Sequence, residues 1–262
     1  MMRHGGLLLL LFVLFGLPVI VLVLTSVAPG WRFPEIWPTE FSLQGLDYLL
    51  DNLNTILIAL GSSCVFSLLT VLTTLGMCLA PAAVFARSVF PGKTFLVALL
   101  LTPALVPLIT FAMGLHFLFI KSSLADTLPG VVLILSMFSY PYMFRALVAG
   151  FQNMGQDYGI CARNLGAGNL RIMLSVELPL LLPAIIAGGS VVFLVAFSEY
   201  FLVFLIGGGS VPSFTGTLVP LLSSSNRALA SILTLVFLFV PVCLFLCLDT
   251  TLVRIYRRRG LI

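Results

Sequence analysis

The stretch DYGICARNLGAGNLRIMLSVE, Asp157–Glu177, is a polar island between two long apolar runs, and Leu178 and Pro179 follow it directly. The runs on either side are hydrophobic enough to lie in lipid. We therefore expect this segment to be the place where the chain meets water, or a partner in water. Because it interrupts an otherwise apolar sequence, it also fixes where the membrane-spanning segments on either side of it end and begin.

The composition places the chain in the membrane. Of its 262 residues, 60% are hydrophobic and 8% are charged, whereas about 25% of the residues in a soluble globular chain are charged. A soluble domain of this size has no interior large enough for so much apolar surface, so the sequence predicts an integral membrane protein. The net charge of +4 does not indicate nucleic-acid binding, because the basic residues lie at the ends of apolar runs. The five cysteines show neither metal-site nor disulfide spacing.

Six apolar stretches are long enough to cross about 30 Å of hydrocarbon, and helices are expected because an isolated strand would leave backbone groups unpaired in lipid. The sequence therefore predicts an all-α, polytopic protein with six transmembrane helices in a single domain covering residues 1–262. The predicted spans are Leu7–Val27, Asn54–Ala86, Thr94–Ile120, Thr127–Gly150, Leu180–Ile206 and Ala228–Leu248.

Two spans are longer than the ~20 residues that a crossing needs, so we expect the second and third to tilt, bend or project from the bilayer. Proline removes a helix hydrogen bond and crowds the preceding turn, and we expect bends or ends at Pro81, Pro103 and Pro107. The first span is interpreted as a retained anchor, since its apolar run is longer than the core of a signal peptide.

The distribution of Lys and Arg predicts the orientation, because cytoplasmic loops are enriched in both. With the N-terminus inside, the cytoplasmic side carries ten of them: Arg3, Arg87, Lys93, Arg145, Arg163, Arg171, Arg254, Arg257, Arg258 and Arg259. The other side carries three: Arg32, Lys121 and Arg227. Both termini and the polar island are therefore predicted to be cytoplasmic.

Within the polar island we expect two short helices, Asp157–Leu165 and Leu170–Val176, with Asp157 capping the first. Gly166 is expected to end that helix in a left-handed turn. Two helices joined at a glycine can form a compact knob that fits the groove of a partner protein. The residues alone leave a second interpretation open, in which the segment is an amphipathic loop on the inner leaflet.

The register of Ala162, Gly166 and Pro179 resembles the cytoplasmic loop of permease subunits in binding-protein-dependent ABC importers. In that family a Glu-Ala-Ala triplet precedes the glycine and the proline, whereas this chain has Ile160 and Cys161 in place of the Glu and the first Ala. The resemblance implies the type I importer permease fold and a loop that contacts the ATPase. The contact residues expected from it are Asp157, Ala162, Arg163, Gly166, Ala167 and Pro179. Asp157 or Arg163 would make the polar contact in place of the missing Glu.

The same resemblance implies the partners. The chain has no P-loop, so it is not expected to be an enzyme or to bind a cofactor itself; ATP and Mg would be bound by a separate dimer of ATPase subunits. A second permease subunit, homologous or identical, and an external (periplasmic) substrate-binding protein complete the expected complex. Its expected location is the bacterial inner (plasma) membrane, in contact with lipid and without nucleic acid or metal.

Glu199 is an acidic residue well inside the fifth predicted span, where a carboxylate is costly and normally faces a water-filled path or a partner. Together with Phe197, Tyr200 and Phe201 it forms the candidate substrate path, since a carboxylate and ring faces attract cations. This patch resembles the polyamine branch of the family, which favours a small organic cation such as spermidine or putrescine. A structural or gating role, or an ion pair with Arg227 or His116, remains open.

Two other classes of protein also remain open. A subunit of a secondary carrier or channel without an ATPase predicts ion-coupling carboxylates at mid-membrane and paired broken helices. A membrane scaffold needs no polar path at all. Co-purification with an ATPase bound through residues 157–177 separates the importer from both alternatives.

Overall fold

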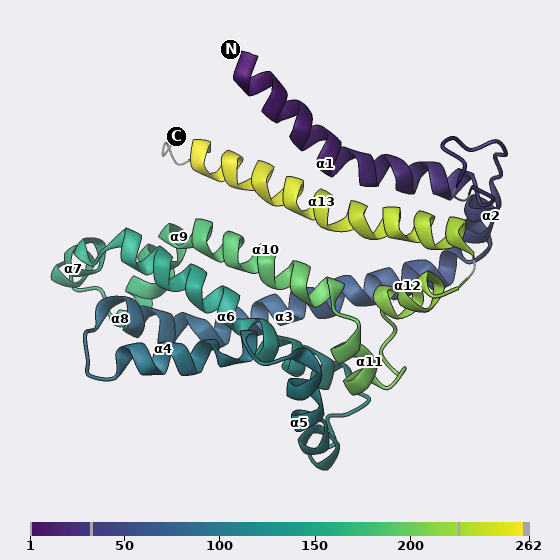
Figure 1. The fold of residues 1–262 in the computed structure, drawn as a ribbon. Helices are drawn as coiled ribbons and strands as arrows, with labels where there is room; N and C mark the ends of the chain where they lie inside the picture. The colour runs from purple at the N-terminus through teal and green to yellow at the C-terminus, as the bar shows by residue number, and fades with distance from the viewer. Residues whose placement is uncertain (1, 32–33, 225, 259–262) are drawn as a thin grey trace. The chain divides into compact units, whose positions relative to one another are not determined.

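The computed structural model describes residues 2–31, 34–224 and 226–258, and throughout these ranges the chain folds into helices and connecting turns without a strand (Figure 1). The prediction of an all-α protein is therefore confirmed. Two residues of the charge count, Arg32 and Arg259, lie outside the described residues.

The helices divide into two compact units, of which the first comprises Met1–Gly61 and Ser213–Cys247. It holds helix α1 (Met2–Val27), α2 (Gln44–Asp51), the start of α3 (Leu53–Arg87), α12 (Phe214–Leu222) and most of α13 (Arg227–Arg258). Its buried core is formed by Ile56, Phe214, Leu218 and Leu233. The hydroxyl groups of Thr25 and Ser231 join α1 to α13 through a hydrogen bond of 2.7 Å.

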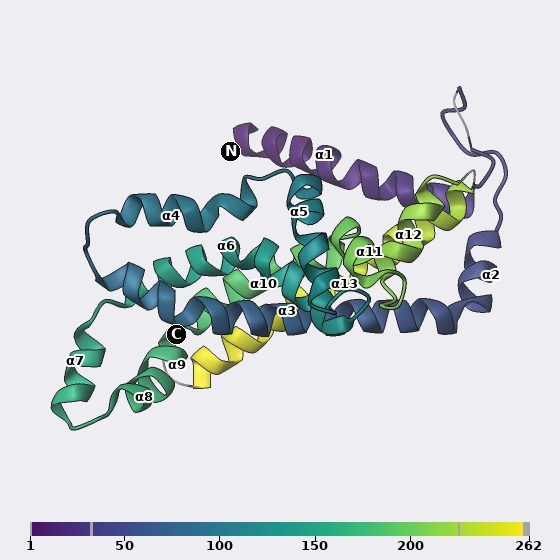
Figure 2. The same ribbon diagram turned by 90° about the horizontal axis from the view of Figure 1, so that it is seen from below.

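The second unit, Ser62–Pro212 with Leu248–Ile262, contains the polar island. After α3 it continues through α4 (Lys93–Leu101), η1 (Thr102–Ala104), α5 (Leu108–Lys121) and α6 (Leu128–Met154). The chain then forms α7 (Asp157–Asn164), α8 (Asn169–Ile172), the π-helix η2 (Met173–Glu177), α9 (Leu178–Leu180), α10 (Leu182–Ser198) and α11 (Phe201–Gly207). Figures 1 and 2 both place α7 and α8 at one end of this unit, which we call its loop end.

Four described helices are long and apolar enough to cross a membrane by themselves: α1, α3, α6 and α13. Two further spans exist if each of two bent helix pairs crosses once. One pair is Lys93–Ala104 with Leu108–Lys121, bent by 90°, and the other is Asn169–Leu180 with Leu182–Ser198, bent by 71°. Against the six predicted spans, the described residues therefore offer four, or up to six if each bent pair is counted as one span.

The prolines explain part of this pattern. Pro107 has an extended backbone, with ψ of 131°, and immediately precedes α5, so the bend expected from Pro103 and Pro107 is present. Pro81 lies inside the continuous 35-residue helix α3 and does not end it. The fifth span was predicted to reach Ile206, and this boundary is wrong: α10 ends at Ser198, Glu199 is extended, and α11 begins at Phe201.

Helices α6 and α10 pack closely because small residues line their contact. A Cβ atom at Gly188 would lie 2.8 Å from the Ala146 Cβ, and one at Gly150 would lie 2.5 Å from the Ala184 Cβ. Real Cβ atoms do not approach so closely, so glycine is required at both points for the two backbones to meet.

Candidate functional site

The polar island folds as two short helices joined by a turn. The first, α7, spans Asp157–Asn164, as predicted to within one residue. The prediction that Asp157 caps it is wrong: the residue before the helix is Gln156, and Asp157 lies in the first turn, where its charge favours the helix dipole. The second helix is shorter than predicted, because α8 ends at Ile172 and the chain continues as a π-helix to Glu177.

Gly166 ends α7 in the predicted left-handed conformation, with φ of +83°. The Ala167 N–H donates to the Ala162 carbonyl at 3.1 Å, and the Gly166 N–H donates to the Arg163 carbonyl at 2.9 Å. These two bonds form a Schellman motif, which pairs carbonyls that the end of a helix leaves free. The turn is therefore set by backbone geometry at four of the predicted contact residues: Ala162, Arg163, Gly166 and Ala167.

The surface of this loop carries large apolar side chains that the sequence analysis did not select. Leu165 is 88% exposed and Leu170 is 74% exposed, and Tyr158, Ile160 and Leu174 are also exposed. Asp157 and Arg163 are exposed, whereas Ala162, Ala167 and Pro179 are half-buried. Exposed apolar side chains gathered on one loop are typical of an interaction surface. Their exposure could not be read from the sequence, because apolar residues in a short amphipathic helix normally face inward.

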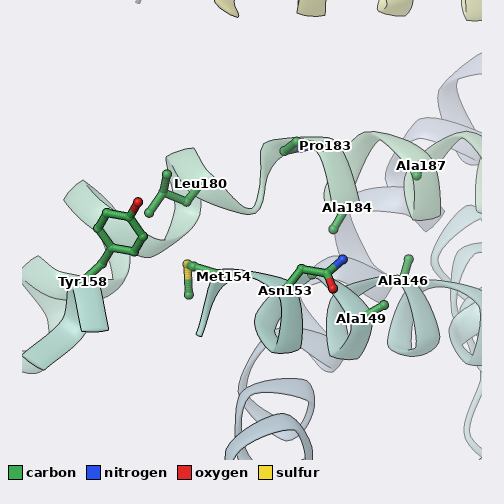
Figure 3. A pocket seen from close by; sticks show the side chains of 10 residues that line it. Ala146, Ala149, Asn153, Met154, Tyr158, Leu180, Pro183, Ala184 and Ala187 are labelled. Carbon is green, nitrogen blue, oxygen red and sulfur yellow. The ribbon is translucent and has the colours of Figure 1, made fainter. Parts of the chain in front are cut away.

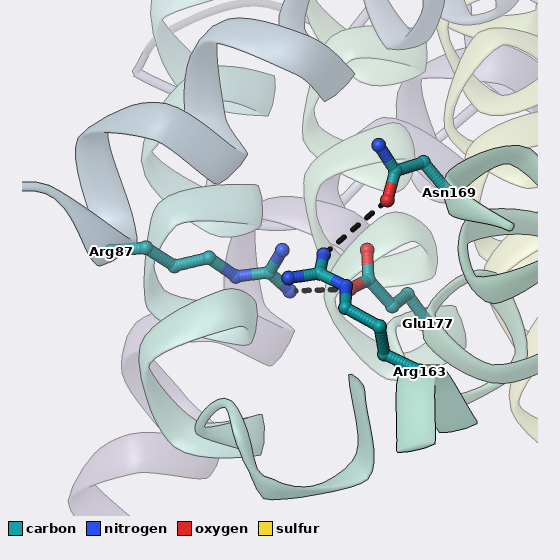
Figure 4. Close-up of polar contacts among 4 residues, drawn as sticks. All are labelled: Arg87, Arg163, Asn169 and Glu177. Carbon is teal, nitrogen blue, oxygen red and sulfur yellow. Dashed lines mark hydrogen bonds and ion pairs between the residues drawn. The ribbon is translucent and has the colours of Figure 1, made fainter. Parts of the chain in front are cut away.

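The loop is fastened to the rest of the unit by an ion pair between residues 90 positions apart. Arg87 Nη2, at the end of α3, donates to Glu177 Oε1 over 2.8 Å (Figure 4). The Glu177 side chain is 6% exposed and that of Arg87 is 27% exposed. The Arg87 guanidinium also lies over the ring of Phe151 in α6, 4.8 Å from its centroid. One side chain thus joins α3, α6 and the end of the loop.

A second polar contact lies within the loop itself. Arg163 Nη2 donates to Asn169 Oδ1 over 3.3 Å, which connects the end of α7 to the first residue of α8 (Figure 4). Both residues are exposed, so the contact is open to competition from water and contributes little to stability. The role of Arg163 or Asp157 as the polar contact to a partner stays a prediction.

A cleft of about 590 Å³ lies beside the loop, between the end of α6 and the start of α10. Five lining residues are small: Ala146, Ala149, Gly150, Ala184 and Ala187. The rest are Asn153, Met154, Tyr158, Leu180 and Pro183.

Ala146, Gly150 and Ala184 also belong to the close contact of α6 with α10. The two polar side chains of the cleft come from the end of α6 and the start of α7. The Asn153 amide points from α6 toward α10, and the Tyr158 ring extends from α7 toward Leu180 (Figure 3). Both side chains can donate a hydrogen bond. None of the described lining residues is acidic. We call this space the α6–α10 cleft.

The candidate path residues lie elsewhere, beyond the other end of α10. Phe197 is fully buried and stacks on Phe193 with ring centroids 5.7 Å apart, and Tyr200 stacks on Phe204 at 5.6 Å. Phe201 packs against the buried core cluster. These residues start ten positions beyond Ala187, so at 1.5 Å per residue they lie roughly 15 Å or more from the cleft along the helix. The structure therefore does not bring them together with the α6–α10 cleft.

Glu199 has a local partner. Its Oε1 accepts the backbone N–H groups of Phe201 at 3.0 Å and Leu202 at 3.2 Å, at the start of α11. The carboxylate thus satisfies amide groups that the first turn of a helix leaves free. In the continuous helix predicted for the fifth span, Glu199 would have no such free amide groups beside it. The break in the helix supplies the partner that a carboxylate at this position needs.

The fold is similar to that of one chain in a solved transporter structure. A structure titled as a bacterial ABC transporter involved in the import of the acidic polysaccharide alginate contains a chain that aligns with 95% of this chain and 95% of its own length. The TM-score is 0.71 and the sequence identity is 16%. The likeness at this identity establishes the fold.

The sequence comparison identifies the family. Residues 4–260 match the family described as binding-protein-dependent transport system inner membrane component, and the chain belongs to this family. The match extends over nearly the whole chain, so it includes both units and the loop. It agrees with the resemblance inferred from the Ala162, Gly166 and Pro179 register.

Several similar proteins are permeases named for the transport of oxyanions or of molybdenum. The molybdate/tungstate transport system permease protein WtpB of Thermococcus kodakarensis is 33% identical over 116 residues, 44% of this chain and 47% of that protein. The molybdenum transport system permease protein ModB of Escherichia coli is 32% identical over 148 residues, 51% of this chain and 64% of that protein. The sulfate transport system permease protein CysT of Salmonella typhimurium is 29% identical over 139 residues, 48% and 50% respectively.

These matches span about half to two thirds of the relatives' lengths. They do not support the polyamine branch to which the Phe197–Phe201 patch was assigned. That patch is short, and its carboxylate belongs to a helix start in this structure. The resemblance to polyamine permeases therefore rested on residues that serve the local fold.

Proposed function

We propose that this chain is the transmembrane permease subunit of an ATP-driven ABC importer that carries a tetrahedral oxyanion such as molybdate, tungstate or sulfate. It forms half of the translocation path with a second permease subunit, identical or homologous. A pair of ATPase subunits binds ATP and Mg on the cytoplasmic side, and an external binding protein delivers the substrate. The protein lies in the plasma (inner) membrane with both termini cytoplasmic.

The observation that carries the substrate class is the make-up of the α6–α10 cleft. Its described lining offers the Asn153 amide and the Tyr158 hydroxyl as neutral donors and presents no carboxylate. An oxyanion is an acceptor with several oxygens, so donors favour it and a carboxylate would repel it. The names of the molybdate/tungstate and sulfate relatives agree with this preference.

The coupling proposal rests on the loop. Residues 157–177 present exposed apolar side chains to a partner, and the loop is fastened to α3 and α6 through Arg87. In the proposed cycle ATP closes the ATPase pair and pulls on the loop. The movement passes through the Arg87–Glu177 pair to the ends of α3 and α6, and hydrolysis resets it. Such coupling requires a firm connection between the loop and helices that have two arrangements.

Reconstitution tests the proposal directly. The chain is placed in proteoliposomes with the ATPase and the binding protein encoded beside its gene, and ATP hydrolysis and uptake are measured with molybdate, tungstate, sulfate and spermidine. We expect at least one oxyanion to stimulate both activities and spermidine to stimulate neither. Stimulation by spermidine alone would overturn the oxyanion assignment, and a stable complex that lacks an ATPase would favour a carrier or a scaffold.

Substitutions in the α6–α10 cleft test whether its hydrogen-bond donors are needed for oxyanion uptake. Hydrogen bonds to a charged group contribute about 1.5–3 kcal/mol, so Asn153→Ala and Tyr158→Phe are each expected to lower oxyanion uptake by roughly ten-fold or more. Met154→Leu, between them in the sequence, is the matched control because it removes no donor, and its uptake should be unchanged. ATPase assembly is measured alongside, because Tyr158 also belongs to the loop. Full uptake in the Asn153 and Tyr158 variants would remove the cleft from the path.

A further inference from the structure

A second pocket, of about 230 Å³, lies among α3, α4 and α6 and shares only Ala149 with the α6–α10 cleft. Most of its wall is apolar: Phe85, Val97, Phe144, Val148 and Ala149. Three polar side chains complete the lining: Lys93, Arg145 and Gln152. We call it the basic pocket, and the proposed transport function does not use it.

Two aromatic rings give the basic pocket a firm apolar wall. Phe85 of α3 and Phe144 of α6 meet edge to face, with ring centroids 5.4 Å apart and planes inclined at 80°. Aromatic pairs prefer this arrangement, so the wall does not depend on a bound ligand. A ligand that fills the pocket therefore needs an apolar part.

The positive charges in this pocket have no counter-charge in the lining. Lys93 Nζ donates to the Ser88 carbonyl over 2.9 Å, which uses one of its three donors. No hydrogen bond or ion pair joins the Arg145 guanidinium to another described residue, and the side chain is exposed. None of the described lining residues is acidic. The pocket therefore holds two cations whose remaining donors are available to an anion.

The N-terminus of α4 adds to the positive potential of the basic pocket. Lys93 is the first residue of this nine-residue helix, and no side chain caps its N-terminus. The N-terminus of a helix carries a partial positive charge and free N–H groups, which favour a phosphate group. Lys93, Arg145, the Gln152 amide and this helix end therefore all favour an oxygen-rich anion.

The position of Arg145 in α6 and the apolar wall of the pocket bear on the source of the anion. Arg145 lies nine residues before the end of α6 at Met154, about 13 Å along a helix that is long and apolar enough to span a membrane. Its long side chain can extend to the membrane interface. The pocket thus joins cationic groups to an apolar wall, beside a helix that is long and apolar enough to span a membrane. A free inorganic anion gains nothing from that wall, whereas a phospholipid matches both parts.

We propose that the basic pocket binds an anionic phospholipid, with the phosphate held by Lys93 and Arg145 and an acyl chain against Phe85 and Phe144. Basic pockets between transmembrane helices on the cytoplasmic side suit anionic headgroups. The bound lipid ties α4 to α3 and α6 at the loop end of the unit. This site goes beyond the proposed transport function and does not require the ATPase or the substrate to exist.

Lipid titration of the purified full chain tests this site. The chain is kept in a neutral detergent, and dioleoylphosphatidylglycerol or dioleoylphosphatidylcholine is added while native mass spectrometry counts the bound lipid. Each basic residue near a membrane surface contributes about a five-fold gain in affinity for an anionic headgroup. Lys93→Gln and Arg145→Gln are therefore each expected to weaken phosphatidylglycerol binding by about five-fold, and the double variant by about 25-fold.

Controls separate a specific site from general charge. Lys121→Gln removes an exposed cation at the end of α5, outside the pocket, and should leave lipid binding unchanged. Arg145→Lys keeps the charge and should bind phosphatidylglycerol within two-fold of the unmodified chain, which also shows that the position tolerates substitution. Phosphatidylcholine binding should be weaker and the same in all variants.

Three outcomes would overturn the proposal. The first is a double variant that binds phosphatidylglycerol as tightly as the unmodified chain. The second is an equal loss of binding in Lys121→Gln. The third is displacement of the lipid by millimolar inorganic phosphate, which would show a free-anion site instead. All of these readouts use the chain alone, so failure here leaves the oxyanion importer untouched, and failure of import leaves the lipid site untouched.

Discussion

Arg87 Nη2 lies 2.8 Å from Glu177 Oε1, and this contact joins the last residue of α3 to the last residue of the π-helix that ends the loop. The carboxylate is almost completely buried, and the guanidinium lies over the Phe151 ring. A buried charge is stable only while its partner is present. The position of the loop on the unit therefore depends on a pair of residues that lie in different predicted segments.

Removing one partner of this pair should destabilise the protein more than removing both. Arg87→Gln leaves Glu177 buried without a cation and is expected to cost about 3 kcal/mol, seen as a lower Tm in detergent. The double variant with Glu177→Gln should recover most of that loss, because two neutral amides can pair. Arg163→Gln is the control, since its exposed contact with Asn169 is worth little. Equal losses in the single and double variants would contradict a coupled pair.

Gly166→Val should weaken assembly with the ATPase while the protein stays in the membrane. The φ of +83° is a conformation that a β-branched residue adopts only at a cost of about 1–2 kcal/mol or more. No atom would meet a Cβ there, so the effect comes from the backbone and not from a clash.

Gly168→Val is the matched control for the turn, because Gly168 has φ of −71° and open space around it. Co-purification with the ATPase should fall for Gly166→Val and persist for Gly168→Val. If both variants assemble and transport normally, the geometry of the turn plays no part in docking.

The exposed leucines of the loop should contribute to the same association. Leu165→Ser and Leu170→Ser remove apolar side chains that would be buried in an interface, and buried anchors commonly contribute more than 1 kcal/mol each. The double variant is expected to weaken ATPase binding by roughly ten-fold or more. Val89→Ser is the control, because Val89 is 97% exposed outside the loop. Circular dichroism should be unchanged in all of these variants, and undiminished binding would place the docking surface elsewhere.

Two substitutions of Glu199 distinguish a helix-capping role of its carboxylate from a role in the substrate path. Glu199→Gln keeps an oxygen that can accept the Phe201 and Leu202 amides, so import should remain within about two-fold of the unmodified chain. Glu199→Ala removes the acceptor and should lower stability by about 1 kcal/mol. Uptake and Tm are measured on both variants. Loss of import in Glu199→Gln at an unchanged Tm would return this carboxylate to the path.

Replacing glycine by alanine should have different effects in the α6–α10 contact and at an uncrowded position of α3. Gly188→Ala introduces a Cβ 2.8 Å from that of Ala146, and overpacking of this kind costs about 1–3 kcal/mol. Gly76→Ala lies in α3 with no atom within 4 Å of the new Cβ, and should be neutral or slightly stabilising because alanine favours a helix. Tm in detergent distinguishes the two, and an equal response would mean that the helices separate readily.

Local features of this chain were predictable from the sequence and distant pairings were not. Gly166 was predicted correctly because a glycine after a short helix favours a left-handed end, and Pro107 because its ring disfavours a continuous helix. No sequence feature predicts the 90° angle at that bend, because the angle depends on how the helices pack. The Arg87–Glu177 pair joins residues 90 positions apart, and the sequence around either residue does not indicate which partner it has.

The region around Glu199 shows why the candidate path was harder to predict. Hydropathy over 180–206 is continuous, so the helix break after Ser198 leaves no trace in an apolar profile. A carboxylate in such a run indicates a path if the helix is continuous, and indicates a cap if it is broken. The α6–α10 cleft was missed for a related reason, because alanines and glycines mark close packing and open space equally well.

The π-helix Met173–Glu177 has a consequence for helical phase. Its hydrogen bonds run from residue i to i+5, one residue more per turn than in an α-helix, and each residue of an α-helix accounts for about 100° of rotation. A helical wheel drawn from α8 through α9 at 3.6 residues per turn therefore points Glu177 about 100° away from its true direction. Conversion of this segment to α-helix would rotate the Glu177 carboxylate away from Arg87. The π-helical geometry therefore sets the direction in which the end of the loop faces α3.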